Sequence, residues 1–410
     1  MDDNILSKRS KYAYNAIEEE DVLSNQIQKK GAEVIRLNKG DPPQYIKTPK
    51  YIVDAYIKAL KEYKTTYSDS TGLKELKEAV SNRYKRDYKV NFTSNDVIVT
   101  QGVSEALSFI NSSLINNGDN AMLFKPYYPQ YMPLLQMYGG KPIIRSYEHK
   151  LNWGINPESM RKALKIMPKN KLKKIKYMLI TNPNNPTGTV LSRKILEDIT
   201  DIANEFNLFL ISDEIYDEII YNGAKFTSIS QIAKGMPHMV LNGASKVYDA
   251  TGFRIGFMII PENDKFSNMI KSKLKNYALV RLSVNTPAQY AIAEAINNKV
   301  EHDKAIKEMV KEISDRVNYS FNMLKENEYL DTIKPNGSFY IFPKINMEKL
   351  KFKNDKEFVE KLLKEKGVQV TRGSGFGEPG YFRIVSLPPK TILKSAISKI
   401  NDFCIENKKK

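Results

Sequence analysis

Short apolar runs alternate with helix-like segments between about residue 95 and residue 260. Runs of this length that are rich in Val, Ile and Leu are typical of buried strands, and the segments between them have helical spacing. Alternation of this kind predicts parallel crossover units in a sheet covered by helices on both faces. The predicted strands are DVIVT (96–100), NAMLF (120–124), PIIRSY (142–147), KYMLIT (176–181), LFLIS (208–212), MVLN (239–242) and RIGFMII (254–260).

The pattern changes after about residue 262 to longer helical segments with fewer strands. This change predicts a second, smaller α+β domain. We expect a large α/β domain over 49–290, whose mostly parallel seven-stranded sheet is sandwiched by helices, and a small domain over 291–410. Residues 1–48 are expected to form an N-terminal arm and part of the small domain, with LNKGDPPQYIKTP (37–49) crossing between the two. The predicted elements of the small domain are helices at 286–299, 301–326, 355–366 and 390–407 and strands at 337–342 and 381–387.

The composition is that of a folded chain, because 41% of the 410 residues are hydrophobic and 10% are aromatic. No apolar run approaches the roughly 18 residues of a membrane-spanning helix, and the start, MDDNILSKRSKY, has no apolar signal region. A single cysteine, Cys404, excludes an intrachain disulfide and a cysteine metal cluster. We therefore expect a soluble, cytoplasmic protein.

The net charge of +17 does not by itself indicate a nucleic-acid partner. Lysines are spread along nearly every helix, and the densest runs, at 169–176 and 408–410, are not interleaved with aromatic residues. Solvated lysine faces are the favoured interpretation. The three histidines, His149, His238 and His302, are far apart in sequence, so neither a histidine metal site nor a Ser-His-Asp triad is expected.

Two loops that follow predicted strands offer groups for an anionic ligand. In TQGVSEAL (100–107), Gly102 turns the chain into a helix whose first N–H groups, at Val103 and Ser104, form an anion site. A simple strand-to-helix turn with Ser104 as a cap is an equal alternative. In NPNNPTG (182–188), two prolines and a glycine fix a turn that presents the amide of Asn185, although a plain surface loop has similar composition.

Two further strand ends carry an acid and two cations. Asp213 in SDEIY (212–216) follows a buried strand, where a carboxylate needs a cationic partner, and Tyr216 lies three residues on. Asp213 as a helix cap is the alternative. In NGASKVYDATGFRIGF (242–257), Lys246 leaves a strand among small residues and Arg254 follows eight residues later. A desolvated lysine near another cation has a lowered pKa and is a competent nucleophile and base.

All four loops lie at carboxyl ends of strands, where open α/β sheets bind ligands. Together they supply an anion cradle, a carboxylate, a phenol, an amide, a lysine and an arginine. This set suits pyridoxal 5′-phosphate, which needs a lysine for its aldehyde, a carboxylate for its ring nitrogen, and cations and amides for its phosphate.

The chain resembles the class I/II pyridoxal-phosphate aminotransferases of fold type I over nearly its whole length, and within them the archaeal-type alanine aminotransferases. The matching segments, in order, are IRLNKGDPP, YSDSTGLKEL, NPNNPTG, SDEIYD, SKVYDATGFRIGF, VNTPAQ, GSFYIFPK and GSGFGEPGYFR. The resemblance implies that Lys246 binds the cofactor covalently and moves the substrate proton, while Asp213 pairs with the ring nitrogen. It assigns the other cofactor contacts to Gly102, Val103, Ser104, Tyr128, Asn185, Tyr216, Ser245 and Arg254.

The resemblance also implies a homodimer, because Tyr67 would reach the phosphate from a second subunit. Arg383 would clamp the substrate α-carboxylate with two parallel hydrogen bonds, which lysine cannot reproduce, and Gly40 and Asn185 would complete that clamp. Two positions depart from the family pattern. Gly243 stands where a phosphate-binding serine is common, with Ser245 as a replacement, and Asp249 stands where a small or apolar residue is usual.

The implied reaction is a ping-pong amino transfer, with alanine and 2-oxoglutarate as the favoured pair. Arg281 is a candidate for the distal carboxylate of glutamate, with an interdomain or solvated arginine as the alternative. Walls containing Tyr14, Tyr127 and Tyr128 would favour aromatic substrates instead, so aspartate, aromatic amino acids and kynurenine stay open. A carbon–sulfur lyase shares the scaffold. A DNA-binding regulator with an aminotransferase-like domain is the alternative from another class. It is not expected, since about forty residues before the Gly40 segment are too few for both a winged helix and a linker.

Overall fold

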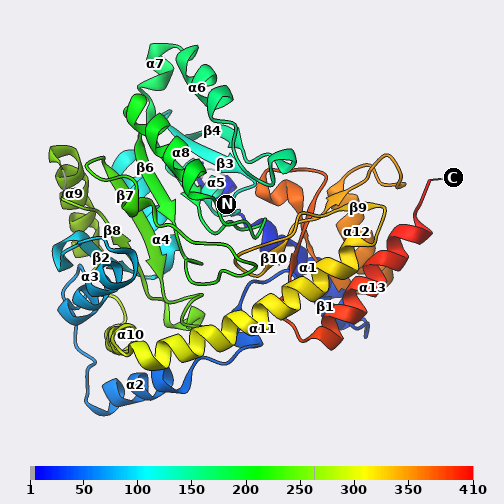
Figure 1. The fold of residues 1–410 in the computed structure, drawn as a ribbon, viewed down its shortest axis with the longest axis horizontal. Helices are drawn as coiled ribbons and strands as arrows, with labels where there is room; N and C mark the ends of the chain where they lie inside the picture. The colour runs from blue at the N-terminus through cyan, green and yellow to red at the C-terminus, as the bar shows by residue number, and fades with distance from the viewer. Residues whose placement is uncertain (1–4, 263, 410) are drawn as a thin grey trace.

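A seven-stranded sheet forms the centre of the computed structural model, which describes residues 5–262 and 264–409 (Figure 1). The strand order is β2-β8-β7-β6-β5-β3-β4. All seven predicted strands are confirmed, with β8 shorter than predicted. Their bounds are β2 Val97–Thr100, β3 Asn120–Lys125, β4 Lys141–Ser146, β5 Ile175–Thr181, β6 Phe209–Asp213, β7 His238–Gly243 and β8 Gly256–Ile259.

Six of these strands run in one direction, and β8 runs antiparallel to both of its neighbours, β2 and β7. The expected mostly parallel sheet is therefore confirmed. Because β8 is reversed, its amino end lies at the same edge as the carboxyl ends of β2, β5, β6 and β7. A residue that precedes β8 can thus share a site with residues that follow the other strands.

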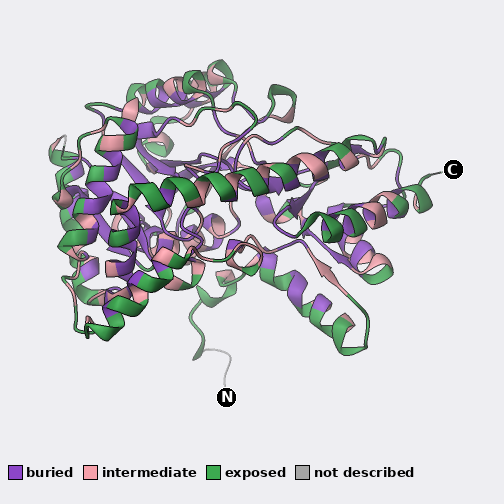
Figure 2. Cartoon of the chain, turned by 60° about the horizontal axis from the view of Figure 1, so that its bottom comes forward, coloured by how far each residue is buried: buried purple, intermediate pink, exposed green. Residues whose placement is uncertain are grey.

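Helices cover the sheet, and the strands inside them are largely buried (Figure 2). Alternate strand residues face two separate cores, as expected for buried strands. Met178 and Ile180 of β5 face the core that contains α3, α8 and α10, whereas Tyr177 and Leu179 face the core that contains α4, α5 and α9. These helices are α3 Lys74–Tyr88, α4 Gly102–Leu114, α5 Tyr131–Met137, α8 Arg193–Glu205, α9 Lys265–Arg281 and α10 Thr286–Asn297.

A second, smaller lobe contains the C-terminal residues together with the N-terminal helix α1 (Figure 1). The long helix α11 runs from the sheet to this lobe. The predicted strands at 337–342 and 381–387 are longer than those observed. The helices are α1 Ala16–Lys29, α11 Lys299–Lys325, α12 Asp355–Lys366 and α13 Lys390–Glu406; the strands are β1 Ile35–Arg36, β9 Leu330–Asp331, β10 Tyr340–Ile341, β11 Lys344–Ile345, β12 Val368–Gln369, β13 Thr371–Arg372 and β14 Phe382–Val385.

The proline-bearing segment 37–49 passes from the smaller lobe to the sheet. Leu37 donates its N–H to Gln369 O (2.8 Å) and accepts from the N–H of Val385 (2.9 Å), both in the smaller lobe. The hydroxyl of Thr48 donates to Asp249 O, beside β7. The predicted crossing is therefore observed, and α2 (Lys50–Lys61) follows it.

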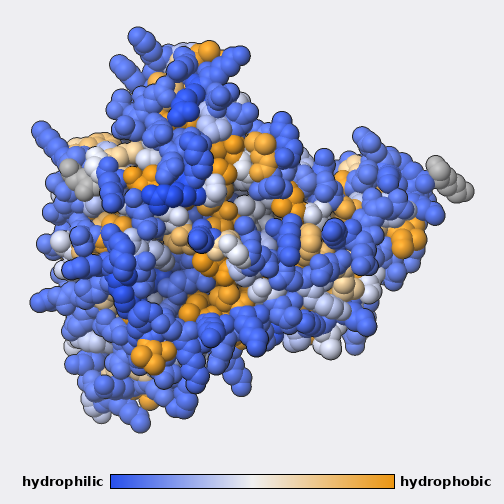
Figure 3. Space-filling view, in the orientation of Figure 1, coloured by the Kyte–Doolittle hydropathy of each residue, from blue (hydrophilic) through white to orange (hydrophobic). Residues whose placement is uncertain are grey.

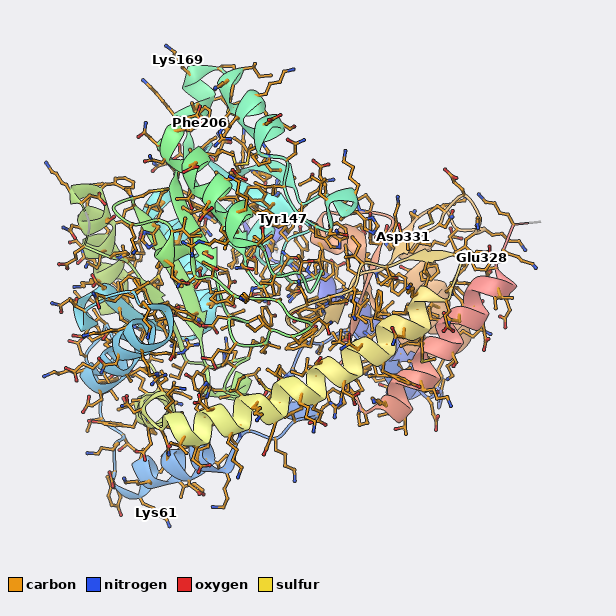
Figure 4. All side chains as sticks on the ribbon, in the orientation of Figure 1. Lys61, Tyr147, Lys169, Phe206, Glu328 and Asp331 are labelled. Carbon is orange, nitrogen blue, oxygen red and sulfur yellow. The ribbon has the colours of Figure 1, made fainter. Side chains whose placement is uncertain are left out.

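Hydrophilic residues cover most of the outer surface, and apolar residues on the face in Figure 3 gather between the two lobes. The lysine-rich segment forms a projection of α6 (Pro157–Lys165) and α7 (Lys169–Leu172), with Lys169 at its tip (Figure 4). Over the described residues, no helix combines the length and the apolar composition that crossing a bilayer requires.

Candidate active site

A cavity of about 410 Å³ lies at the sheet edge where β2, β5, β6 and β7 end. Residues from four strand ends, the crossing segment and the smaller lobe meet there, so the cavity depends on both lobes. The structure brings together in its lining most of the residues that the sequence singles out: Gly40, Val103, Ser104, Tyr128, Asn185, Asp213, Tyr216, Ser245, Lys246, Arg254 and Arg383.

Asp213, the last residue of β6, points a buried carboxylate into the cavity. Oδ2 accepts the hydroxyl of Tyr131 (2.6 Å), and Oδ1 accepts the N–H of Ile215 (3.3 Å). Burial raises the pKa of Asp213 to about 6, although these hydrogen bonds and the charge of Lys246 oppose the rise. The carboxylate is therefore fixed in position and would be stabilised by a cation in the cavity.

Lys246 follows β7 and donates from Nζ to Gly40 O (2.7 Å). Burial lowers the pKa of its amine to about 8, with Arg383 and Arg254 lowering it further while Asp41 and Asp213 oppose them. With this pKa about a tenth of the amine is neutral at pH 7, far more than for an ordinary lysine, and the neutral form is the one that a nucleophile or a general base requires.

The amino end of α4 and Arg254 form one side of the cavity. Val103 and Ser104 lie in the first turn of α4, where backbone N–H groups lack helical acceptors. Arg254 has a left-handed backbone (φ +56°) and donates from Nη1 to Thr251 O (2.9 Å). Gly102 permits this approach, since a Cβ there would lie 2.5 Å from Nη2 of Arg254. The arrangement suits a phosphate group.

Arg383, on β14, is buried between the rings of Tyr340 and Phe376, whose centroids lie 4.6 and 4.8 Å from its Cζ. Nη1 donates to Oδ1 of Asn185 (2.9 Å) and Nη2 donates to Asn38 O. Nε is buried without a partner. A buried guanidinium with an unused donor is suited to a carboxylate ligand.

Several cavity residues escaped the sequence analysis. Tyr131, which donates to Asp213, lies three residues after the predicted Tyr128, in KPYYPQY (125–131). The hydroxyl of Tyr340 forms a 2.8 Å hydrogen bond with that of Tyr216, and its segment, GSFYIF, was noted without a role. Asn15, Ile17 and Glu18, at the start of α1, have no sequence signal. Lys39 and Asp41 lie in the matching segment IRLNKGDPP, in which only Gly40 has a predicted role.

Other expected residues are not in the cavity. Arg281 donates to Glu105 (2.9 Å) and to Ser70 O (2.6 Å) and does not line the cavity of its own chain, so its predicted role toward a distal carboxylate would require a second chain and stays a prediction. Of the three tyrosines predicted to form a wall of the site, Tyr128 lines the cavity, whereas Tyr14 and Tyr127 do not.

Tyr67 is 82% exposed and lies outside the cavity of its own chain. Its predicted role requires a second chain and stays a prediction.

The two departures from the family pattern have structural explanations. A Cβ at Gly243 would lie 2.6 Å from Ile255 O, so this backbone has no room for a serine, while Ser245 lines the cavity. Asp249 is buried outside the cavity lining, with Oδ1 unpartnered, and burial raises its pKa to about 8. Its carboxyl is largely protonated at neutral pH and adds little charge near Lys246.

Residues 32–400 match the family described as aminotransferase class I and II. The chain belongs to this family. It is 34% identical over 97% of its length to a (5-formylfuran-3-yl)methyl phosphate transaminase of Methanocaldococcus jannaschii, covering 99% of that protein. It is 32% identical over 93% to an aspartate aminotransferase of Bacillus sp. (strain YM-2), covering 94% of that protein. An alanine aminotransferase structure from Pyrococcus furiosus superposes with a TM-score of 0.92 at 38% identity, over 98% of this chain and 100% of that one.

Family membership and fold agree with the resemblance noted from the sequence. The protein is an aminotransferase of the pyridoxal-phosphate-dependent class. The names of its relatives cover alanine, aspartate and an aldehyde phosphate, so family membership alone does not identify the substrate.

Proposed function

We propose that this aminotransferase moves the amino group of L-alanine to 2-oxoglutarate, giving pyruvate and L-glutamate, with pyridoxal 5′-phosphate in the cavity. The observation that carries the proposal is the convergence, in one cavity, of the Lys246 amine with its lowered pKa, the buried Asp213 and the buried Arg383. The similarity to the Pyrococcus furiosus alanine aminotransferase supports alanine as the amino donor.

The donor set fits the cofactor. The α4 amino end with Arg254 would hold the phosphate, Asp213 the ring nitrogen, and Asn185 with Tyr216 the ring oxygen. When bound, the cofactor supplies an aldehyde that condenses with amines and a ring that accepts the electrons of a broken Cα–H bond.

Arg383 and Lys246 would handle the substrate itself. The guanidinium would hold the α-carboxylate, which fixes the direction of the Cα–H bond. The Lys246 amine would accept the Cα proton and deliver it again, because its lowered pKa of about 8 lets the amine lose and regain a proton within about one pH unit of neutrality. Asp213, with its position fixed by Tyr131, would keep the negative charge that stabilises a cationic ring nitrogen.

We further propose a cytoplasmic homodimer in which Tyr67 of each chain completes the phosphate site of the other. The large domain would comprise 49–290, and the small domain 291–410 with part of 1–48. The exposure of Tyr67 outside its own cavity supports this arrangement.

The visible spectrum of the purified protein tests the proposal. We expect an absorption band from lysine-bound cofactor, which alanine bleaches and 2-oxoglutarate restores. Lys246→Ala should lose that band. No bleaching with alanine but bleaching with aspartate, tyrosine or kynurenine would replace the donor, and release of pyruvate and ammonia without an acceptor would indicate a carbon–sulfur lyase.

A further inference from the structure

We infer that Lys39 is a specificity-determining residue that binds the distal carboxylate of a dicarboxylic substrate, and that Glu18 occupies this position when the substrate has no second carboxylate. The inference rests on the proposed function, which requires one site to accept both alanine and glutamate.

The charges of the cavity lining point to Lys39. In the described chain four cationic side chains line the cavity: Lys39, Lys246, Arg254 and Arg383. The last three are engaged by the proposed roles toward the cofactor and the α-carboxylate. Since Arg281 lies outside the cavity, Lys39 is the lining cation that remains for a second carboxylate.

Asp21 holds Lys39 in place. Nζ of Lys39 lies 2.6 Å from Oδ2 of Asp21, whose other oxygen accepts from Asn38 (2.9 Å) and Gln369 (2.7 Å). Burial opposes ionisation of Asp21, but the hydrogen bonds from Lys39, Gln369 and Asn38 outweigh it and lower its pKa. Asp21 is thus a buried, charged anchor that fixes the ammonium without lining the cavity.

Glu18 is the exchangeable partner of the same ammonium. Its Oε2 lies 3.1 Å from Nζ of Lys39, and its side chain is 57% exposed. Among the described residues, the carboxylate of Glu18 contacts the ammonium of Lys39. An exposed pair of this kind contributes little to stability, so a substrate carboxylate of the same chemistry can displace Glu18.

This arrangement explains how one cavity could serve both substrates. Asp21 is shared between Lys39 and Arg36, whose Nη1 lies 3.3 Å from Oδ1 of Asp21. With alanine bound, Asp21 and Glu18 together balance these two cations, and no uncompensated cation faces the methyl group. With glutamate or 2-oxoglutarate bound, the distal carboxylate takes the place of Glu18, and Asp21 keeps the ammonium oriented. Charge is balanced in both states.

Calorimetric titration of the holoenzyme with two unreactive acids tests this. Glutarate has a second carboxylate and butyrate has none. We expect wild type to bind glutarate at least tenfold more tightly, Lys39→Met to abolish the preference, and Lys39→Arg to retain part of it. Glu18→Gln should strengthen glutarate binding severalfold, because it removes the competing carboxylate, and leave butyrate unchanged.

Half-reaction rates provide the second measurement. Lys39→Met should lower kcat/KM for glutamate and 2-oxoglutarate by roughly 10- to 100-fold and change that for alanine by less than about threefold. Lys50→Met is the matched control, because this substitution removes the same charge at a position on α2 where the side chain is 86% exposed. Equal losses for alanine and glutamate, or no loss for either, would overturn the inference. Failure of wild type to transfer any amino group would instead overturn the proposed function, while the glutarate preference would still report on Lys39.

Discussion

At the scale of single residues, the charge of Asp213 can be separated from its structural contacts. An asparagine keeps one oxygen that accepts from Tyr131, and it loses the charge together with the longer hydrogen bond from the Ile215 N–H (3.3 Å). We therefore expect Asp213→Asn to lower kcat for the alanine half-reaction by about 100-fold or more. Its thermal stability should stay close to that of wild type, because the relief of the buried charge offsets the lost hydrogen bond from Ile215. Stopped-flow kinetics and calorimetry measure the two effects. A kcat within threefold of wild type at equal cofactor content would remove Asp213 from its assigned role.

Asp249 carries a pH dependence of stability that is separate from catalysis. Burial raises its pKa to about 8 in the folded chain, compared with about 4 in an unfolded one. The folded state binds the proton more tightly, so the stability contributed by this group is full below about pH 4 and is lost as pH rises toward 8. Asp249→Asn should therefore stabilise the protein increasingly with pH, by at least ~1 kcal/mol more at pH 9 than at pH 5.5.

Melting temperatures of both forms across this pH range test the prediction. Asparagine also tolerates the left-handed backbone at position 249 (φ +46°), so backbone strain does not obscure the result. A difference between variant and wild type that stays constant with pH would show that Asp249 does not titrate with a raised pKa.

These cases show which residue-level predictions the sequence permits. Asp213 and Lys246 follow buried strands at one sheet edge, and strand ends can be read from apolar runs. Tyr131 lies in a helix and Lys39 lies in an irregular segment. At such positions only the folded chain shows which group a side chain contacts. The contact of Arg281 with Glu105 is hidden from the sequence for the same reason, since the two residues lie 176 positions apart.

At the scale of elements, contact between β8 and the start of α4 positions the expected phosphate site. A Cβ at Gly256 would lie 2.6 Å from Gly102 C and 2.9 Å from Val103 N, and all of these are backbone atoms. Gly256→Ala should push α4 from the sheet, lower Tm by roughly 2–5 °C and weaken cofactor binding about tenfold. Gly252→Ala is the control for Tm, because nothing lies within 4 Å of a Cβ there. Equal Tm values for the two variants would contradict this packing argument.

The apolar pattern predicted where strands lie but not how they pair. Continuous apolar runs indicate burial on both faces and carry no information on direction, so the reversal of β8 is visible only in the fold. The predicted strands at 337–342 and 381–387 are short in the structure because residues beside them bind irregular segments. Ser338, for example, donates its N–H to Ile219 O (2.8 Å). The helix at 355–366 was predicted with the observed bounds, since Asn354 caps one end and Gly367 adopts the left-handed conformation at the other.

At the scale of the whole molecule, the segments around Tyr67 offer a surface for a second copy. The hydroxyl of Thr286 donates to Thr66 O (2.8 Å), and Tyr56 and Asn285 lie within hydrogen-bond distance (3.2 Å), so 66–67, α2 and the chain after α9 are adjacent. Large apolar side chains are exposed on α2 and just after it, and at the end of α9 and just after it: Val53, Ile57, Leu60, Tyr63, Leu279, Val280 and Leu282. A chain that exposes so many apolar residues near one another is typical of an oligomer.

The proposed dimer makes activity depend on this surface. Light scattering should give a mass of twice the 47.0-kDa chain.

Val280→Asp, at a site 86% exposed in the single chain, should produce monomers and lower activity at least tenfold, because Tyr67 no longer reaches the other cavity. Ile166→Asp places the same charge at another exposed apolar site, 75% exposed between α6 and α7, and should leave mass and activity unchanged. Tyr67→Phe should remain dimeric and weaken cofactor binding about tenfold, since it removes one phosphate donor. A Val280→Asp monomer with full activity would show instead that each chain holds a complete site.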